Sequence, residues 1–172
     1  MTSSCSPSTV PANKRFEGLK VLILNGPNLN RLGLRKPEIY GSKTMAQILL
    51  EIQQTWPEVH FVYKQSNHEG DLIDWIQSIN DEMSAASPLN DANDVKGIVL
   101  NAGGYSHTSV ALRDAVEESE VPVVEVHISD ITKREPFRQT SLLTPVCAYN
   151  IIGKGTKGYE EAVKYLLTAN GR

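Results

Sequence analysis

Short apolar runs and amphipathic segments alternate along the chain from residue 19 onward. Runs rich in Val, Ile and Leu have the length of buried strands at residues 19–26, 59–66, 95–104, 121–129 and 144–152. Segments with apolar residues near a 3.6-residue period predict helices at residues 44–56, 69–81, 108–119 and 158–170. Strands that alternate with helices in this way form a parallel sheet covered on both faces. We therefore predict an α/β fold, a flavodoxin-like doubly wound sheet of five parallel strands in the order 2-1-3-4-5.

The length of the chain suits one domain preceded by a short tail. With 172 residues, it can form a single domain with a sizeable core. We predict a flexible N-terminal tail over residues 1–18 and a single catalytic domain over residues 19–172. The tail is rich in serine and lacks the apolar core of a secretory signal, which leaves an organellar transit peptide as the alternative. Residues 81–94 are small and polar, and we expect a surface insertion there.

Composition and charge narrow the class of protein. Apolar residues make up 40% and charged residues 22%, as in ordinary globular proteins, and no apolar run has the length of a membrane span. The formal charge of −3 gives no reason to expect nucleic acid as a partner. Basic residues nevertheless collect at residues 31–36 and 133–138, which favours a small anion as ligand. The two cysteines, Cys5 and Cys147, imply no disulfide framework, so we expect a reducing, cytoplasmic location.

Polar side chains stand where three of the predicted strands end. Ligands of open parallel sheets bind beyond the carboxyl ends of the strands, at the switch point between strands 1 and 3. We expect the following residues to converge there: Asn25, Asn28, Asn101, His107, Glu125, His127, Ser129 and Asp130. Such a set of amides, imidazoles and carboxylates suits the binding of a polar small molecule and the transfer of protons.

The same residues exclude several relatives of the fold. A flavin-binding protein would need a loop rich in Ser or Thr after strand 1, and a phosphoacceptor response regulator would need Asp where Asn101 stands. Walker and dinucleotide glycine fingerprints are absent from the sequence. His107 and His127 lack a third ligand at a usual spacing, so we expect no metal site.

Glu125 and His127 are two residues apart on a predicted strand, so both side chains project from the same face of the sheet. The carboxylate can then hold one imidazole nitrogen and leave the other to exchange a proton. A core histidine satisfied by a neighbouring acid is the alternative. The position at a strand end that faces the switch point favours proton transfer.

Arg35 and Tyr40 lie in a long loop after strand 1, which we interpret as a lid, with a solvated loop as the alternative. Ionising a tyrosine at pH 7 requires about 4 kcal/mol. A guanidinium about 4 Å away supplies roughly that amount at an effective dielectric of about 20. Arg134 and Arg138 can bind a carboxylate or hydroxyls, or simply cover the surface. Asp114, on a helix, has the pattern of a solvated residue.

Three long motifs resemble the type II 3-dehydroquinate dehydratase family, also called the type II dehydroquinases. They are "LNGPNLNRLGLRKPEIYG", "LNAGGYSHTSVALRDA" and "VPVVEVHISDITKREPFR", in that order, and the resemblance extends from about residue 20 to the C-terminus. It implies the reversible anti elimination of water from 3-dehydroquinate to 3-dehydroshikimate through an enolate, in the shikimate or quinate pathway, without metal or cofactor. It also implies a homododecamer, a tetramer of trimers. The tail and the 81–94 insertion depart from the family but lie away from the motifs.

Position by position, the resemblance implies a role for each site residue. Tyr40 would remove the C2 proton of the substrate with its pKa lowered by Arg35, and Asn28 would hold a water or the enolate oxygen. His127, oriented by Glu125, would protonate the departing hydroxyl. The substrate would be bound by Asn101, His107 and Arg138 at the ring hydroxyls, by backbone groups of Ile128 and Ser129 at the carboxylate, by Arg134 at the lid, and by Asp114 from a neighbouring subunit.

Two other functions compete with this one. A flavodoxin-like hydrolase would pair His127 with Ser106 or Ser129, but the G-x-S-x-G elbow is absent. A non-catalytic module would use the switch point only to bind an anion. Formation of the dehydrated product from 3-dehydroquinate distinguishes the dehydratase from both.

Overall fold

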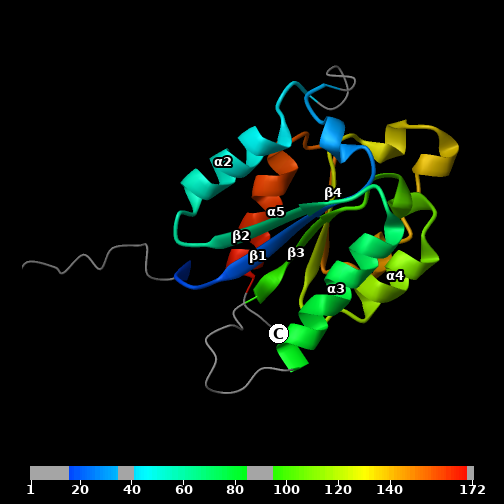
Figure 1. Ribbon diagram of the computed structural model, residues 1–172. Helices are drawn as coiled ribbons and strands as arrows, with labels where there is room; N and C mark the ends of the chain where they lie inside the picture. Colours follow the sequence, from blue (N-terminus) through cyan, green and yellow to red (C-terminus); the bar gives the residue numbers. More distant parts are fainter. Residues whose placement is uncertain (1–15, 35–40, 85–94, 170–172) are drawn as a thin grey trace, which may run out of the picture.

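A five-stranded parallel sheet forms the centre of the protein (Figure 1). The structure is a computed structural model and describes residues 16–34, 41–84 and 95–169. The strands are β1 Lys20–Asn25, β2 His60–Gln65, β3 Val95–Asn101, β4 Val123–His127 and β5 Tyr149–Ile152. Neighbouring strands pair in the order β2-β1-β3-β4-β5, and every pair is parallel. This arrangement confirms the predicted doubly wound, flavodoxin-like sheet.

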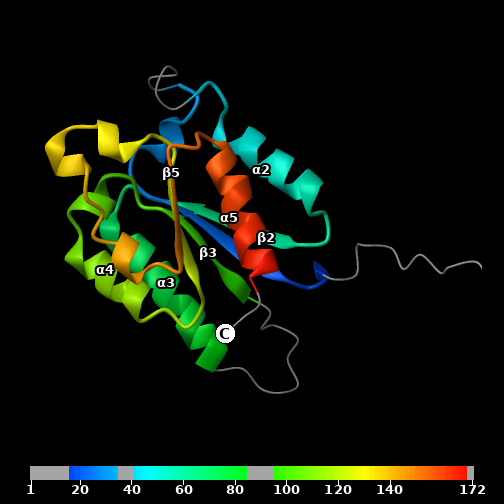
Figure 2. The same ribbon diagram turned by 180° about the vertical axis from the view of Figure 1, so that it is seen from behind.

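Helices cover both faces of the sheet. Helices α2 and α5 lie on one face, and α3 and α4 lie on the other, as the two opposite views show (Figures 1 and 2). The helices are α2 Met45–Thr55, α3 Glu69–Ser84, α4 Val110–Glu117 and α5 Lys157–Thr168. Helix α2 begins at a capping box, in which Thr44 Oγ1 accepts a bond from Gln47 N and Gln47 Oε1 accepts one from Thr44 N.

The two faces of the sheet have separate hydrophobic cores. Val21 and Ile23 of β1 pack into the core beneath α2 and α5, whereas Leu22 and Leu24 pack into the core beneath α3 and α4. Successive side chains of a strand point to opposite faces, so a strand covered on both sides must be apolar throughout. This explains the uninterrupted apolar run of β1.

The sequence-based boundaries differ most from the structure at the fifth strand and at the end of helix α3. The fifth strand begins at Tyr149 rather than at Thr144, because residues Thr144–Val146 form the 3-10 turn η7. Pro145 lies within that turn and has no N–H to donate to a sheet. Helix α3 continues to Ser84, so the insertion expected from residue 81 begins inside a helix, and residues 85–94 lie outside the described part of the chain.

The connections after β1, β3 and β4 consist mostly of short 3-10 turns. These are η2 Leu29–Arg31, η4 Gly103–His107, η5 Ile131–Lys133 and η6 Pro136–Arg138. All of them follow the carboxyl ends of their strands and lie at one edge of the sheet (Figure 1). Among the described residues, no helix combines the length and apolar character needed to cross a membrane.

Candidate active site

A cavity of about 160 Å³ lies beyond the carboxyl ends of β1, β3 and β4. This is the switch point at which a doubly wound sheet binds its ligand. Predicted site residues that line the cavity are Asn28, Asn101, His107, His127, Ile128, Ser129, Arg134 and Arg138. The fold therefore brings together residues from three connections that are up to 110 positions apart in the sequence, from Asn28 to Arg138.

The close approach of the β1 and β3 connections builds the floor of this site. Gly26 N donates a hydrogen bond to Asn101 O at 2.8 Å, and a Cβ on Gly26 would collide with the carbonyl group of Ala102. Gly103 has a φ of +59° and its Cα faces the backbone of Pro27, where an added Cβ would lie 3.1 Å from the carbonyl oxygen. Only glycine permits both the approach and the left-handed turn.

Asn28 is held in an unusual backbone conformation at the cavity. Its φ of 67° and ψ of −2° place it in the left-handed region, which asparagine tolerates better than most residues. Asn28 N donates to Asn67 Oδ1 at 2.9 Å, and Gln65 Nε2 donates to the same oxygen at 3.2 Å. The end of β2 therefore supports the turn that carries Asn28.

The phenol of Tyr159 on α5 fixes two strand-end amides. Tyr159 donates to Asn25 Oδ1 at 2.8 Å and accepts from Asn101 Nδ2 at 2.9 Å. Asn101 Oδ1 in turn accepts from Gly103 N at 3.2 Å, so one N–H of the Asn101 amide remains for a ligand. Burial of Tyr159 raises the pKa of its hydroxyl above the ordinary value, which keeps it protonated at neutral pH.

Two strand-end residues that are predicted to line the cavity form hydrogen bonds within the fold instead. Asn25 is fully buried and bonded to Tyr159, and Asp130 caps η5 by accepting from Thr132 N at 3.1 Å. Asp130 also pairs with Lys133 at 3.0 Å. Neither belongs to the described lining of the cavity, because each finds its polar partners in the fold itself.

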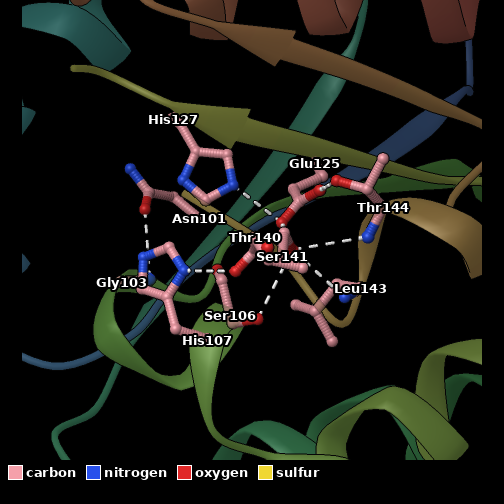
Figure 3. Close-up of polar contacts among 10 residues, drawn as sticks. All are labelled: Asn101, Gly103, Ser106, His107, Glu125, His127, Thr140, Ser141, Leu143 and Thr144. Carbon is pink, nitrogen blue, oxygen red and sulfur yellow. Dashed lines mark hydrogen bonds and ion pairs between the residues drawn. The ribbon is translucent and has the colours of Figure 1, made fainter. Parts of the chain in front are cut away.

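His127 and Glu125 form a buried hydrogen-bonded pair, as their spacing on β4 predicts (Figure 3). His127 Nε2 lies 2.7 Å from Glu125 Oε1, and the two side chains are 5% and 0% exposed. Figure 3 shows the other ring nitrogen, Nδ1, on the side away from Glu125. Because His127 lines the cavity, the pair presents one ring nitrogen to a ligand and anchors the other.

Glu125 is ionised in this environment. Burial by itself raises the pKa of the carboxyl, but hydrogen bonding and attraction to His127, together with the hydroxyls of Ser141 and Thr144, lower the pKa below its ordinary value. Ser141 Oγ donates to Oε1 and Thr144 Oγ1 donates to Oε2, both at 2.5 Å. The spacing of β4 predicts the imidazole partner, whereas nothing local in the sequence points to these two hydroxyls.

His107 lies beside His127, with ring centroids 6.0 Å apart and an angle of 25° between the rings. The Nδ1 atom of His107 lies 2.8 Å from the carbonyl oxygen of Thr140, which only an N–H can satisfy. Burial lowers the pKa of His107 most, and the nearby His127 and Arg138 lower it further, against the raising effect of the Thr140 bond. His107 is therefore a neutral ring at pH 7, and its Nε2 is an acceptor for a ligand hydroxyl.

Three arginines give the cavity a positive wall. Arg134 Nη1 donates to Ser129 Oγ at 3.3 Å, and both Arg134 Nε and Arg138 Nε lie 3.3 Å from Glu135 Oε2. Arg31 of η2 also lines the cavity. The sequence shows Arg31 only as part of a basic segment, because nothing local distinguishes it from a surface residue. The wall suits an anionic ligand such as a carboxylate.

The other predicted site residues are not among the described residues that line the cavity. Asp114 is exposed on α4 and is not part of this wall within the single chain. Arg35 and Tyr40 lie outside the described residues. Within the described part of the chain, no group of three His, Cys, Asp or Glu side chains has an arrangement that could hold a metal ion.

Comparison with known proteins identifies the family. A sequence model of the dehydroquinase class II family matches residues 19–167. The chain is 46% identical over 152 residues to a 3-dehydroquinate dehydratase of Bacillus subtilis (strain 168), covering 87% of this chain and 95% of that protein. It is 47% identical over 148 residues to a 3-dehydroquinate dehydratase of Azorhizobium caulinodans, covering 85% and 92% of the two chains.

Comparison with a solved structure leads to the same family. The type II dehydroquinase of Butyrivibrio crossotus DSM 2876 superposes with a TM-score of 0.76 at 40% identity, over 86% of this chain and 97% of that one. The matched region contains the whole sheet and every described residue of the cavity wall. The chain therefore belongs to the class II dehydroquinase family.

Proposed function

We propose that this protein is a 3-dehydroquinate dehydratase, which eliminates water from 3-dehydroquinate to give 3-dehydroshikimate in the shikimate or quinate pathway. The observation that carries the proposal is the Glu125–His127 pair at the wall of a cavity rich in arginine, in a chain of the class II dehydroquinase family. The substrate is a hydroxylated keto acid, so its carboxylate, hydroxyls and leaving oxygen require a cation, neutral hydrogen-bonding groups and a proton donor.

Anti elimination requires a base and an acid on opposite sides of the substrate. We assign the acid to His127, whose Nδ1 would give its proton to the departing hydroxyl as the C–O bond breaks and water forms. Glu125 supports this role because it stabilises the imidazolium form before transfer. On the family resemblance we assign the base to Tyr40, with its pKa lowered by Arg35, and the stabilisation of the enolate oxygen to Asn28.

Recognition of the substrate is assigned to the cavity wall. His107 and the free N–H of Asn101 suit ring hydroxyls, because each can form one directed hydrogen bond. The other assigned contacts are Arg138 at a hydroxyl, backbone groups of Ile128 and Ser129 at the carboxylate, and Arg134 at the lid. No step in this scheme requires a metal or an organic cofactor, since loss of water beside a ketone needs only proton transfer.

We further propose a homododecamer, a tetramer of trimers, located in the cytoplasm. The exposed position of Asp114 on α4 supports its assignment to a neighbouring subunit's site, because it has no place in the cavity of its own chain. Sedimentation measurements on wild type and Asp114→Ala test this assignment. Unchanged assembly together with unchanged kinetics would contradict it.

The activity is tested by mixing purified protein with 3-dehydroquinate and following the ultraviolet absorbance of the conjugated product. His127→Ala and Tyr40→Phe should each lower kcat by orders of magnitude with a modest change in KM. His60→Ala is the matched control, because His60 is an exposed histidine at the start of β2. Substrate with borohydride should not inactivate the enzyme, since no Schiff base forms. Absence of product from a folded protein would favour an anion-binding module instead.

A further inference from the structure

Glu125 accepts hydrogen bonds from two residues in addition to His127. The carboxylate is fully buried and accepts three hydrogen bonds, from His127 Nε2 at 2.7 Å, Ser141 Oγ at 2.5 Å and Thr144 Oγ1 at 2.5 Å (Figure 3). A buried charge is costly unless its hydrogen-bonding capacity is met. Two of the three donors are neutral hydroxyls, whose support for the charge does not depend on the protonation state of the imidazole.

The geometry of Ser141 directs its single proton toward Glu125. Its oxygen accepts from Leu143 N at 3.1 Å and from Thr144 N at 3.4 Å, so its acceptor capacity is already used. The other acceptor within reach, the carbonyl oxygen of Ser106, lies at 3.4 Å, compared with 2.5 Å for the carboxylate. The hydroxyl proton therefore points to Glu125.

The segment that carries both hydroxyls is itself fixed from two sides. Leu142 N donates to Ser106 O at 2.8 Å, which ties the segment to η4. Arg113 Nη1 donates to Leu142 O at 2.7 Å, which ties it to α4. The two donors are thus preorganised and need no rearrangement when the charge on the neighbouring imidazole changes.

We propose that Ser141 and Thr144 are positioning residues that keep Glu125 ionised while His127 gains and loses its proton. This inference rests on the proposed function and deepens it. If the carboxylate took the Nε2 proton, Nδ1–H would belong to a neutral imidazole, which is a far weaker acid than imidazolium. Donation from the two hydroxyls opposes that transfer, so the acidic proton stays on a charged ring.

Two other described groups that titrate interact electrostatically with the pair, His107 of η4 and Cys147 before β5. The charged groups that line the same cavity as His127 are Arg31, Arg134 and Arg138. Burial and the negative charge of Glu125 raise the pKa of Cys147 to about 12, which agrees with an ionised carboxylate. A change at Thr144 alters none of these groups. A shift in the titration of His127 after such a change therefore reports on Glu125.

Thr144→Val removes the donor at nearly constant shape, and Thr144→Ser retains it as the matched control. The histidines can be labelled at Cε1 and titrated by NMR in the free protein, with His127→Gln to assign the signal among the four histidines. Loss of a donor leaves the Glu125 carboxylate more basic, so the midpoint of the His127 signal should be about one pH unit higher in the valine variant than in wild type. A shift of this size corresponds to about one hydrogen bond to a charged group. The serine variant should titrate like wild type.

The same variants are then compared in turnover. Thr144→Val should lower kcat by about ten-fold and move the alkaline limb of the pH profile upward, whereas KM changes little. In the Glu125→Gln background the same change should have almost no further effect, because the hydroxyl acts through the carboxylate. If the valine variant does not fold, Thr144→Ala makes the same comparison, since Thr144 is only partly buried.

The proposal would be overturned if a folded valine or alanine variant kept both the His127 titration and the alkaline limb of the pH profile of wild type. It would also be overturned if Thr144→Val lowered kcat equally in wild type and in the Glu125→Gln background. A shifted titration in a protein without dehydratase activity would instead leave the pair as described and refute the proposed function. Ser141→Ala should shift the same titration in the same direction. A Ser141→Ala titration identical to wild type would restrict the role to Thr144 and overturn the proposal for Ser141.

Discussion

Tyr159→Phe removes a single oxygen from the interior, directly behind the active-site strands. In the native protein this oxygen donates to Asn25 Oδ1 at 2.8 Å and accepts from Asn101 Nδ2 at 2.9 Å. Tyr159 and Asn25 are 0% exposed and Asn101 is 4% exposed, so water does not replace the lost bonds without rearrangement. The substitution leaves one amide oxygen and one amide N–H without their partner.

The expected loss in the free energy of unfolding comes from these two groups that have lost their hydrogen-bond partner. An unsatisfied buried polar group costs about 1–3 kcal/mol, and phenylalanine keeps the ring contacts of Tyr159. Two such groups give about 4 kcal/mol as a central value. With a urea m-value of about 2 kcal/mol/M, the unfolding midpoint should fall by about 2 M.

Urea unfolding at one fixed protein concentration measures this loss, since assembly would make the midpoint depend on concentration. Tyr165→Phe, on the same helix, is the matched control. Its hydroxyl reaches Ala148 O only at 3.4 Å in an exposed setting, so its removal should cost less than about 0.5 kcal/mol. Equal midpoints for the Tyr159 and Tyr165 variants would show that the two amides do not depend on the buried phenol.

Further predictions concern the strand-end turn, a helix surface and acid stability. Gly26→Ala should destabilise the protein by about 1–3 kcal/mol, because its Cβ collides with Ala102. Gly104→Ala is the control in the same thermal melting assay and should cost much less stability, because the space around the added atom is open. Gly70→Ala, in the first turn of α3 with no atom near the new methyl, should stabilise it by about 0.5–1 kcal/mol; a lower melting temperature would contradict this. Hydrogen bonds lower the pKa of Glu125 despite burial, so its stabilising contribution is present above a pH of about 4.3 and is lost as the pH falls through the folded-state value. The melting temperature of wild type should therefore decrease more steeply with acidification than that of Glu125→Gln, and parallel curves would contradict the assignment.

Local sequence patterns are sufficient to predict most of the fold. The five apolar runs gave the strands because a buried parallel strand must be apolar on both faces, and the sheet order followed from the doubly wound arrangement. The fifth strand was predicted too long because an apolar run is compatible with either a strand or a turn. The position of Pro145 in the turn η7 shows which one the tertiary structure selected.

The linear pattern is enough to show which strand ends carry amides, imidazoles and a carboxylate, and the two-residue spacing on β4 predicts that His127 and Glu125 meet. The residues that surround them depend instead on how the whole chain packs. Tyr159 reaches Asn25 across 134 positions of the chain, and Thr144 reaches Glu125 across 19. A strand fixes its own side chains by a period of two, whereas contacts between elements depend on how helices and turns dock against the sheet. The hydroxyls that stabilise the buried charge therefore carry no signal in the linear pattern.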